Sequence, residues 1–133
     1  MVLGVGIDLI EAKRIEKIIA QFGERFIRRT YSEEEIAYCW NKPRAFLHFA
    51  ACFAVKEAFL KATGAGFGAG FNLRDIETIH DSQGRPSVRS SGKAAAFLEH
   101  LGVGSTQVSV SHTDDYATAV VILAKEKGVN GSE

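Results

Sequence analysis

The chain has 133 residues with 16 basic and 16 acidic side chains, so its formal net charge is zero. This balance gives no overall electrostatic signal for nucleic acid or an anionic membrane, and no apolar run has the length of a membrane span. No signal peptide is recognisable, and the two cysteines lack the spacing of a metal knuckle or a redox pair. We expect a cytoplasmic protein with one domain in residues 1–125 and a short frayed tail at 126–133.

The first predicted element is a strand at residues 2–7, where apolar side chains alternate with glycines. Gly4 and Gly6 leave room on one face for another backbone or a ligand to approach. Asp8 follows on that face. Asp8 and Glu11 fit a capping box for the first helix, and a carboxylate with two oxygens can cap a helix and also ligate a metal.

Three helices are predicted next. An amphipathic pattern at residues 15–22 indicates the first, and the Ser32 and Glu35 pair is a capping-box signature for a second, short helix. Pro43 suits the first turn of a third helix, which is long, mostly apolar and extends to about Thr63.

A glycine-rich segment at residues 64–70 ends the third helix. Beyond it the sequence predicts strands at 75–80 and 86–89, a helix at 94–101, and strands at 108–111 and 117–123. The order of strand, helices, hairpin, helix and hairpin predicts an α+β fold.

The glycine-rich segment formally contains a dinucleotide-binding pattern in Gly64, Gly66 and Ala69. That fingerprint must follow a strand and open a helix, so that helical N–H groups meet the pyrophosphate. Here the segment closes a helix, where the dipole is negative, so we reject this interpretation. A helix stop explains Gly64 alone, and the remaining glycines favour close approach of the backbone to a bulky ligand.

Glu57 is a carboxylate on an apolar stripe of the third helix, flanked by Phe46, Phe49, Phe53 and Leu60. Burying an ionised carboxylate is costly unless it is paired or binds a metal. Lys61 follows one turn later, at the rim of the same stripe. The two residues suggest phosphate and metal chemistry, and the alternative is an ordinary surface pair between positions i and i+4.

Positive charge is concentrated in residues 13–29, which contain six basic and two acidic side chains, while the rest of the chain is net acidic. A solvated helix face is one interpretation, but the local polarity favours an acidic macromolecular partner or a phosphate. Near the other end, Ser111 and His112 are adjacent in a strand and point to opposite faces, which argues against a Ser–His hydrolase. A lone His112 is more often a structural hydrogen-bonding residue than a catalyst.

Three motifs in this order resemble the bacterial holo-[acyl-carrier-protein] synthase family, the small phosphopantetheinyl transferases. The first is Gly4-Val5-Gly6-Ile7-Asp8-Leu9-Ile10-Glu11 followed by Arg14-Ile15. The second is Phe53-Ala54-Val55-Lys56-Glu57-Ala58, then Lys61-Ala62 and Gly64-Ala65-Gly66. The third is Ser109-Val110-Ser111-His112-Thr113, then Tyr116-Ala117. The match covers roughly residues 4 to 123.

The resemblance implies an antiparallel sheet packed against a long central helix. It implies transfer of 4'-phosphopantetheine from coenzyme A to a serine of apo acyl carrier protein, releasing adenosine 3',5'-bisphosphate. The family forms homotrimers with sites between subunits. By resemblance, Mg²⁺ ligation falls on Asp8 and Glu57, catalytic roles on Glu57 and Lys61, coenzyme A contact on Lys61, Gly64, Gly66 and His112, and acyl carrier protein contact on Arg14 and Arg25.

One departure from the family pattern is Cys52, which stands where many members have an arginine. The phosphate contact that this arginine makes is then absent here or supplied by another residue, Arg44 or Lys56. The general base stays open between Glu57 and a water on the metal. Two other functions remain: a non-catalytic carrier-protein or nucleotide-binding module on this fold, and a Mg²⁺-dependent nucleotide hydrolase.

Overall fold

The structure is a computed structural model that describes residues 1–65 and 70–126. In chain order its elements are β1 (Val2–Glu11), α1 (Ala12–Phe22), α2 (Glu24–Thr30), α3 (Glu33–Trp40), α4 (Ala45–Thr63), the short 3-10 helix η2 (Leu73–Asp75), β2 (Ile76–His80), β3 (Pro86–Ser90), α5 (Gly92–Leu101), β4 (Val103–His112) and β5 (Tyr116–Lys125). A three-stranded antiparallel sheet has the order β1-β5-β4, and β2 and β3 form a separate antiparallel hairpin.

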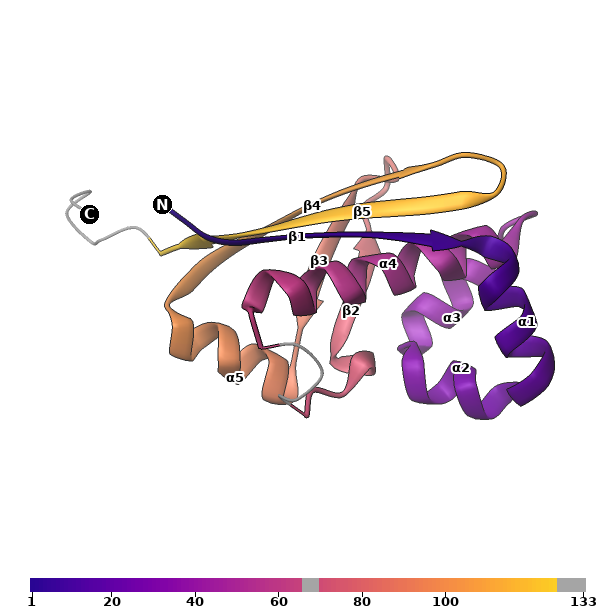
Figure 1. Cartoon of the computed structure of the whole chain (residues 1–133), viewed down its shortest axis with the longest axis horizontal. Coiled ribbons are helices and arrows are strands. Elements are labelled where there is room, and N and C mark those ends of the chain that lie inside the picture. Colours follow the sequence, from indigo (N-terminus) through magenta and orange to yellow (C-terminus); the bar gives the residue numbers. More distant parts are fainter. Residues whose placement is uncertain (66–69, 127–133) are drawn as a thin grey trace.

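The predicted α+β fold is confirmed. Figure 1 shows α4 lying along the three-stranded sheet, with α1, α2 and α3 gathered at one end of the molecule and α5 at the other. The middle strand β5 turns every second side chain toward α4, and these residues are buried: Ala117, Ala119, Val121 and Leu123. Most of α4 is buried as well, so this helix is the centre of the core.

The glycines of β1 allow α4 to lie directly against the strand. A Cβ atom at Gly6 would meet the backbone carbonyl of Ala58, and one at Gly4 would meet that of Ala62. The expected close approach of another backbone is therefore made by a helix of the same chain. It places the last two turns of α4 beside the middle of β1, which is where Asp8 lies.

The structure corrects the start of the chain. Strand β1 does not end near Ile7 but continues to Glu11, because residues 8–11 pair with β5. Asp8 is therefore in the strand and cannot cap α1. The N-cap position is Glu11, and no side chain caps it. The capping box predicted for Asp8 is wrong, and this carboxylate is available for another role.

Other boundaries follow the sequence more closely. The capping box of Ser32 and Glu35 is confirmed at the start of α3, and α4 ends at Thr63 with Gly64 in the left-handed conformation. Pro43 lies two residues before α4 rather than in its first turn. Strand β4 begins at Val103, five residues earlier than predicted, and helix α2 was not predicted. Gly66 and the predicted tail beyond Glu126 lie outside the described residues.

Within the described ranges, none of the helices combines the length and the apolar character that crossing a membrane requires.

Candidate functional site

Two carboxylates far apart in the sequence meet beside β1. Asp8 comes from the strand, and Glu57 comes from the α4 turn that the strand glycines admit. Lys61, one turn after Glu57, donates hydrogen bonds from Nζ to Oδ1 of Asp8 and to the carbonyl oxygen of Ile7, both at 3.0 Å. The hydroxyl of Thr118 donates to the carbonyl of Asp8 at 2.7 Å, which fixes the strand at this point. The predicted grouping of Asp8, Glu57 and Lys61 is thus present.

The second carboxylate oxygen of Asp8 has no partner. Its Oδ2 atom is buried and makes no hydrogen bond within the described part of the chain, and the whole side chain is only 14% exposed. A buried carboxylate oxygen without a partner is costly, so a binding role explains it better than a structural one. Mg²⁺ prefers oxygen donors of this kind, usually one or two carboxylates completed by phosphate oxygens and water.

The chain therefore offers part of a metal site. No group of three metal-binding side chains is found among the described residues, whereas the pair Asp8 and Glu57 supplies two carboxylates. A hard divalent cation held there would need oxygens from a substrate, which is the usual arrangement for Mg²⁺ at a phosphate-transfer site.

Burial and three neighbouring charges act on Glu57. Burial raises the pKa of its carboxyl, Asp8 raises it further, and Lys61 and Arg14 oppose the rise. A proton or a cation between the two carboxylates is therefore favoured. Arg14 is exposed on α1. Its guanidinium lies near enough to Glu57 to lower the pKa of the Glu57 carboxyl.

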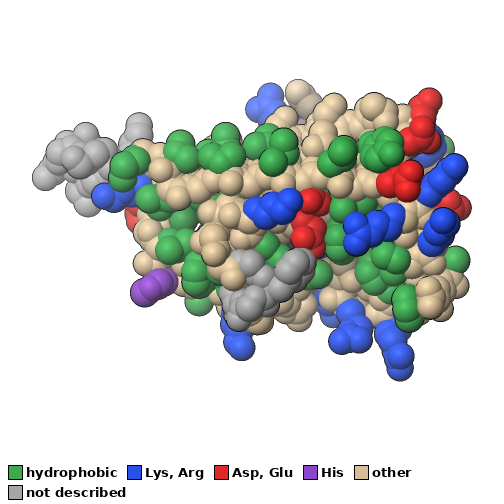
Figure 2. All heavy atoms as spheres, viewed as in Figure 1, with side chains coloured by type: hydrophobic (Ala, Val, Ile, Leu, Met, Phe, Trp, Pro, Cys, Tyr) green, Lys and Arg blue, Asp and Glu red, His purple; other side chains and the backbone are tan. Residues whose placement is uncertain are grey.

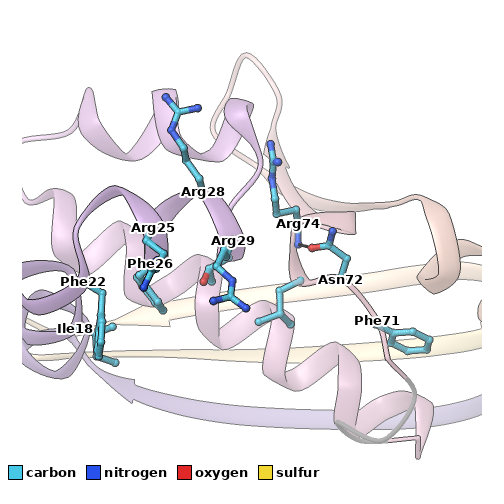
Figure 3. Close-up of a pocket in the computed structure, with 11 residues that line it drawn as sticks. Ile18, Phe22, Arg25, Phe26, Arg28, Arg29, Phe71, Asn72 and Arg74 are labelled. Atoms are coloured by element: carbon cyan, nitrogen blue, oxygen red, sulfur yellow. Dashed lines mark hydrogen bonds between the residues drawn. The ribbon is translucent and has the colours of Figure 1, made fainter.

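Arg25 lines a large cavity in the outer surface of α1 and α2. The cavity measures about 780 Å³ and its other wall is formed by residues 71–74 (Figure 3). Phe22 and Phe26 give it apolar lining, and four arginines also line it: Arg25, Arg28, Arg29 and Arg74. Sequence reasoning found the α2 arginines but missed residues 71–74, which reach the cavity only through the fold.

His112 lies in another part of the molecule. It lines a cavity of about 180 Å³ together with His48, Cys52 and Val55 of α4. Val55 and Glu57 are two residues apart and so are separated by about 200° around the helix axis. Helix α4 therefore stands between His112 and the carboxylate pair, and a single subunit does not bring His112 to Asp8.

The two suggested replacements for the missing arginine have different outcomes. Lys56 is fully buried: its Nζ lies 2.7 Å from Oε1 of Glu35 and also donates to the carbonyls of Leu73 and Ile76. It cannot contact a phosphate from solvent, so that suggestion is wrong. Arg44 is exposed and bonded to Asp114 at 2.9 Å, and its role stays a prediction.

Cys52 is buried beside Cys39, with 3.9 Å between the two sulfur atoms, and both thiols are free. The thiol thus packs against α3 in the core at the point where the arginine is missing.

Comparison with known proteins agrees with this geometry. Residues 4–121 match the model of the 4'-phosphopantetheinyl transferase superfamily. A holo-[acyl-carrier-protein] synthase of Koribacter versatilis (strain Ellin345) is 46% identical over 123 residues, covering 92% of this chain and 98% of that protein. The crystal structure of the Neisseria meningitidis synthase has a TM-score of 0.86 at 31% identity, covering 94% of this chain and all of that one.

A second solved structure is the Helicobacter pylori synthase in complex with coenzyme A. It has a TM-score of 0.79 at 31% identity and covers 90% of this chain and 99% of that one. The motifs around Asp8 and Glu57, the fold and these relatives agree, and the chain belongs to the holo-[acyl-carrier-protein] synthase family of the 4'-phosphopantetheinyl transferase superfamily.

Proposed function

We propose that this protein transfers 4'-phosphopantetheine from coenzyme A to a serine of apo acyl carrier protein. The observation that carries the proposal is the buried, unpartnered Oδ2 of Asp8 beside Glu57 and Lys61, in a chain whose relatives are holo-[acyl-carrier-protein] synthases. The serine oxygen forms a bond to the β-phosphorus of the pyrophosphate. The bond from that phosphorus to the bridging oxygen breaks, and adenosine 3',5'-bisphosphate leaves with the oxygen.

Each group at the site has a proposed task. Asp8 and Glu57 hold Mg²⁺, which when bound offsets the negative charge of the pyrophosphate oxygens. Lys61 is 56% exposed and can release Asp8 to bind a phosphate oxygen, adding a second positive charge. Glu57, or a water held at the metal, is the candidate to accept the serine proton.

We place the carrier protein on the arginine-lined cavity of α1 and α2. Lys and Arg side chains gather at this end of the molecule (Figure 2). The cavity combines arginines with Phe22 and Phe26, which suits an acidic helix with an apolar stripe. Arg14, on the same helix as Phe22, lies beside Glu57, so a carrier seated there would present its serine near the carboxylates.

We propose a homotrimer, on grounds that differ from those expected from the sequence. Gly4 and Gly6 contact α4 of their own chain, so they give no support for a contact between subunits. The outer face of β1 instead exposes a row of apolar side chains (Figure 2), with exposures from 41% to 63%: Leu3, Val5, Ile7 and Leu9. Such a patch is typical of an interface between proteins.

The position of His112 also supports a shared site. Since α4 separates His112 from Asp8 within one chain, coenzyme A can touch both only where two subunits meet. The number three rests on the family. A cytoplasmic location is part of the same proposal and agrees with two free thiols.

The direct test incubates the protein with coenzyme A, Mg²⁺ and apo acyl carrier protein and then weighs the carrier. A gain of one phosphopantetheine group supports transfer. An unchanged carrier with intact coenzyme A would indicate a binding module. Release of adenosine 3',5'-bisphosphate without a heavier carrier would indicate a hydrolase.

A further inference from the structure

The only two cysteines of the chain meet in its core. Cys39 lies near the end of α3 and Cys52 in the middle of α4, and their sulfur atoms are 3.9 Å apart. Both thiols are free and buried. Thirteen positions separate the two residues, so their spacing in the sequence does not predict the contact. Two free thiols at this distance are candidates for a disulfide between the two helices.

Contacts on both sides of Cys39 hold α3 against α4. One turn before it, Glu35 accepts a hydrogen bond from Lys56 at 2.7 Å, and both of these side chains are fully buried. Directly after it, the ring of Trp40 packs on that of Phe49, with 5.0 Å between centroids. The helices are therefore fixed and the two thiols are held face to face. Such a preset arrangement favours a reaction within the chain over one between chains.

Closing a disulfide requires only a small movement. The sulfur atoms of a disulfide are about 2 Å apart, so each sulfur must move by about 1 Å from the observed contact. A small oxidant also has a route to the pair, because Cys52 lines the cavity of about 180 Å³ that lies against α4. Cys52 is therefore the sulfur that such an oxidant meets first.

We propose that Cys39 and Cys52 are a redox-sensitive pair that forms a reversible disulfide when the protein meets a peroxide. The thiolate of Cys52 attacks one peroxide oxygen, the O–O bond breaks, and water leaves after taking a proton, so that Cys52 becomes a sulfenic acid. The sulfur of Cys39 then attacks that of Cys52, the S–O bond breaks, and a second water leaves. The two thiols lose two electrons and two protons, which reduce hydrogen peroxide to two water molecules.

The surroundings of the pair make this reaction slow. The pKa of the Cys52 thiol lies well above its usual value, because of its hydrogen bond with Cys39, its burial and the charges of Cys39 and Glu35, which Lys56 partly opposes. A protonated thiol is a poor nucleophile, so the pair responds to sustained rather than brief exposure. This behaviour fits the proposed cytoplasmic location, where thiols are normally reduced and disulfides are transient.

The disulfide should stabilise the fold without moving the carboxylate site. It links residues 13 positions apart, which restricts the unfolded chain, and it joins two helices that already pack together. Cys52 and Glu57 are five residues apart, or about 140° around the axis of α4, so the bond forms away from the carboxylates. The inference concerns a modification site and does not depend on the proposed transfer reaction.

The first experiment exposes the folded wild-type chain to hydrogen peroxide for hours, unfolds it with iodoacetamide present, and digests it with trypsin. Trypsin cuts after Arg44, between the two cysteines, so a disulfide joins two peptides that separate on reduction. We expect the joined pair after peroxide and two alkylated peptides without it. Peptides are weighed because peroxide also adds oxygen to Met1. A denaturing gel without reductant should show a single-chain band, since the bond lies within one chain.

The second experiment measures thermal unfolding of the oxidised wild-type protein before and after reduction with dithiothreitol. We expect the Tm to be higher by about 5 °C or more in the oxidised protein and to return on reduction. Cys39→Ala and Cys52→Ala each leave one thiol, so neither should give joined peptides or a Tm that rises with peroxide. If these variants fail to fold, the wild-type comparison before and after reduction still decides.

Separate alkylated peptides after sustained exposure would overturn the proposal, and so would a bond between two chains. Joined peptides with an unchanged Tm would refute the stabilising link. Failure of the transferase function is distinguishable, because the carrier mass would not change although the two cysteine peptides are still joined. Transfer by a chain that never forms the disulfide would refute the redox pair alone.

Discussion

Lys61 and Asp8 form an ion pair that uses only half of the carboxylate. The lysine Nζ lies 3.0 Å from Oδ1, while Oδ2 is buried and makes no hydrogen bond within the described part of the chain. The pair therefore links the phosphate-binding and metal-binding roles proposed for the site. The ion pair also explains why Lys61, a largely exposed side chain, is held at a fixed position.

The role of Lys61 can be tested by Lys61→Ala. This change removes a positive charge from the pyrophosphate site, so we expect the KM for coenzyme A to rise and transfer to slow by about tenfold or more. Steady-state kinetics at saturating carrier protein measure both effects. Lys93→Ala, an exposed change on α5, should have neither effect. Unchanged coenzyme A kinetics in Lys61→Ala would exclude this placement of the pyrophosphate.

Glu57 should lower the stability of the free protein. Because folding raises the pKa of its carboxyl, through burial first and then Asp8, the ionised form is disfavoured in the folded state. This loss of folding stability is absent below the unfolded-state pKa of about 4.3 and complete above the folded-state pKa of Glu57. Glu57→Gln should therefore be more stable than wild type at pH 7 without divalent metal, and the gain should vanish at acid pH.

Urea denaturation at the two pH values checks this sign, and Glu77→Gln is a matched control. Burial raises the pKa of Glu77, but hydrogen bonds from Arg89 and Ser32 and the charges of Arg89 and Lys56 together outweigh burial and lower the pKa overall. Its replacement should therefore reduce stability at pH 7, the opposite of Glu57→Gln. A destabilised Glu57→Gln at pH 7 would contradict the assignment.

Charge reversal on α1 and α2 tests carrier docking. Arg25→Glu and Arg14→Glu should each raise the carrier-protein KM by at least about tenfold, equivalent to about 1.4 kcal/mol, with little change for coenzyme A. Added salt should depress wild-type activity more than that of either variant. Arg85→Glu, on the turn between β2 and β3, is the control for net charge. Equal salt sensitivity in all four proteins would place the docking surface elsewhere.

The β1 row can be tested by Ile7→Asp. The side chain is 63% exposed in the single chain, so the change should spare folding and prevent burial of the row against a neighbour. Sedimentation should show a trimer for wild type and smaller species for Ile7→Asp, with loss of transfer. Ser87→Asp, exposed on β3, should stay trimeric. A wild-type monomer that is stable and active at assay concentration would refute the trimer.

Much of the central helix and the carboxylate site could be predicted from sequence. The mostly apolar run after Pro43 indicates a long helix, the Ser32 and Glu35 box marks where α3 begins, and Gly64 marks where α4 ends. The length of β1 could not be predicted, because residues 8–11 form a strand only through their pairing with β5. The sequence therefore predicted Asp8 to be a helix cap, although Asp8 pairs with Ala119 across the sheet.

Buried polar contacts were also hidden from the sequence. Lys56 was suggested as a phosphate contact, yet it is completely buried, and its amine is bound by Glu35 of α3 and by two carbonyls near β2. The cavity lined by His48, His80 and His112 likewise combines residues of α4, β2 and β4. These three elements come together because the β2 and β3 hairpin packs against the sheet. Sequence spacing carries no information about such contacts, since each partner comes from a different element.

The measurement that tests the account most directly is the mass of apo acyl carrier protein after incubation with coenzyme A, Mg²⁺ and either wild-type protein or Asp8→Asn. The variant keeps the shape of the side chain and removes the charge of its free oxygen. We predict that wild type adds one phosphopantetheine group per carrier and that Asp8→Asn, although folded, adds it at least about a thousandfold more slowly. An unmodified carrier with wild type, or full transfer by Asp8→Asn at saturating Mg²⁺, would contradict the account.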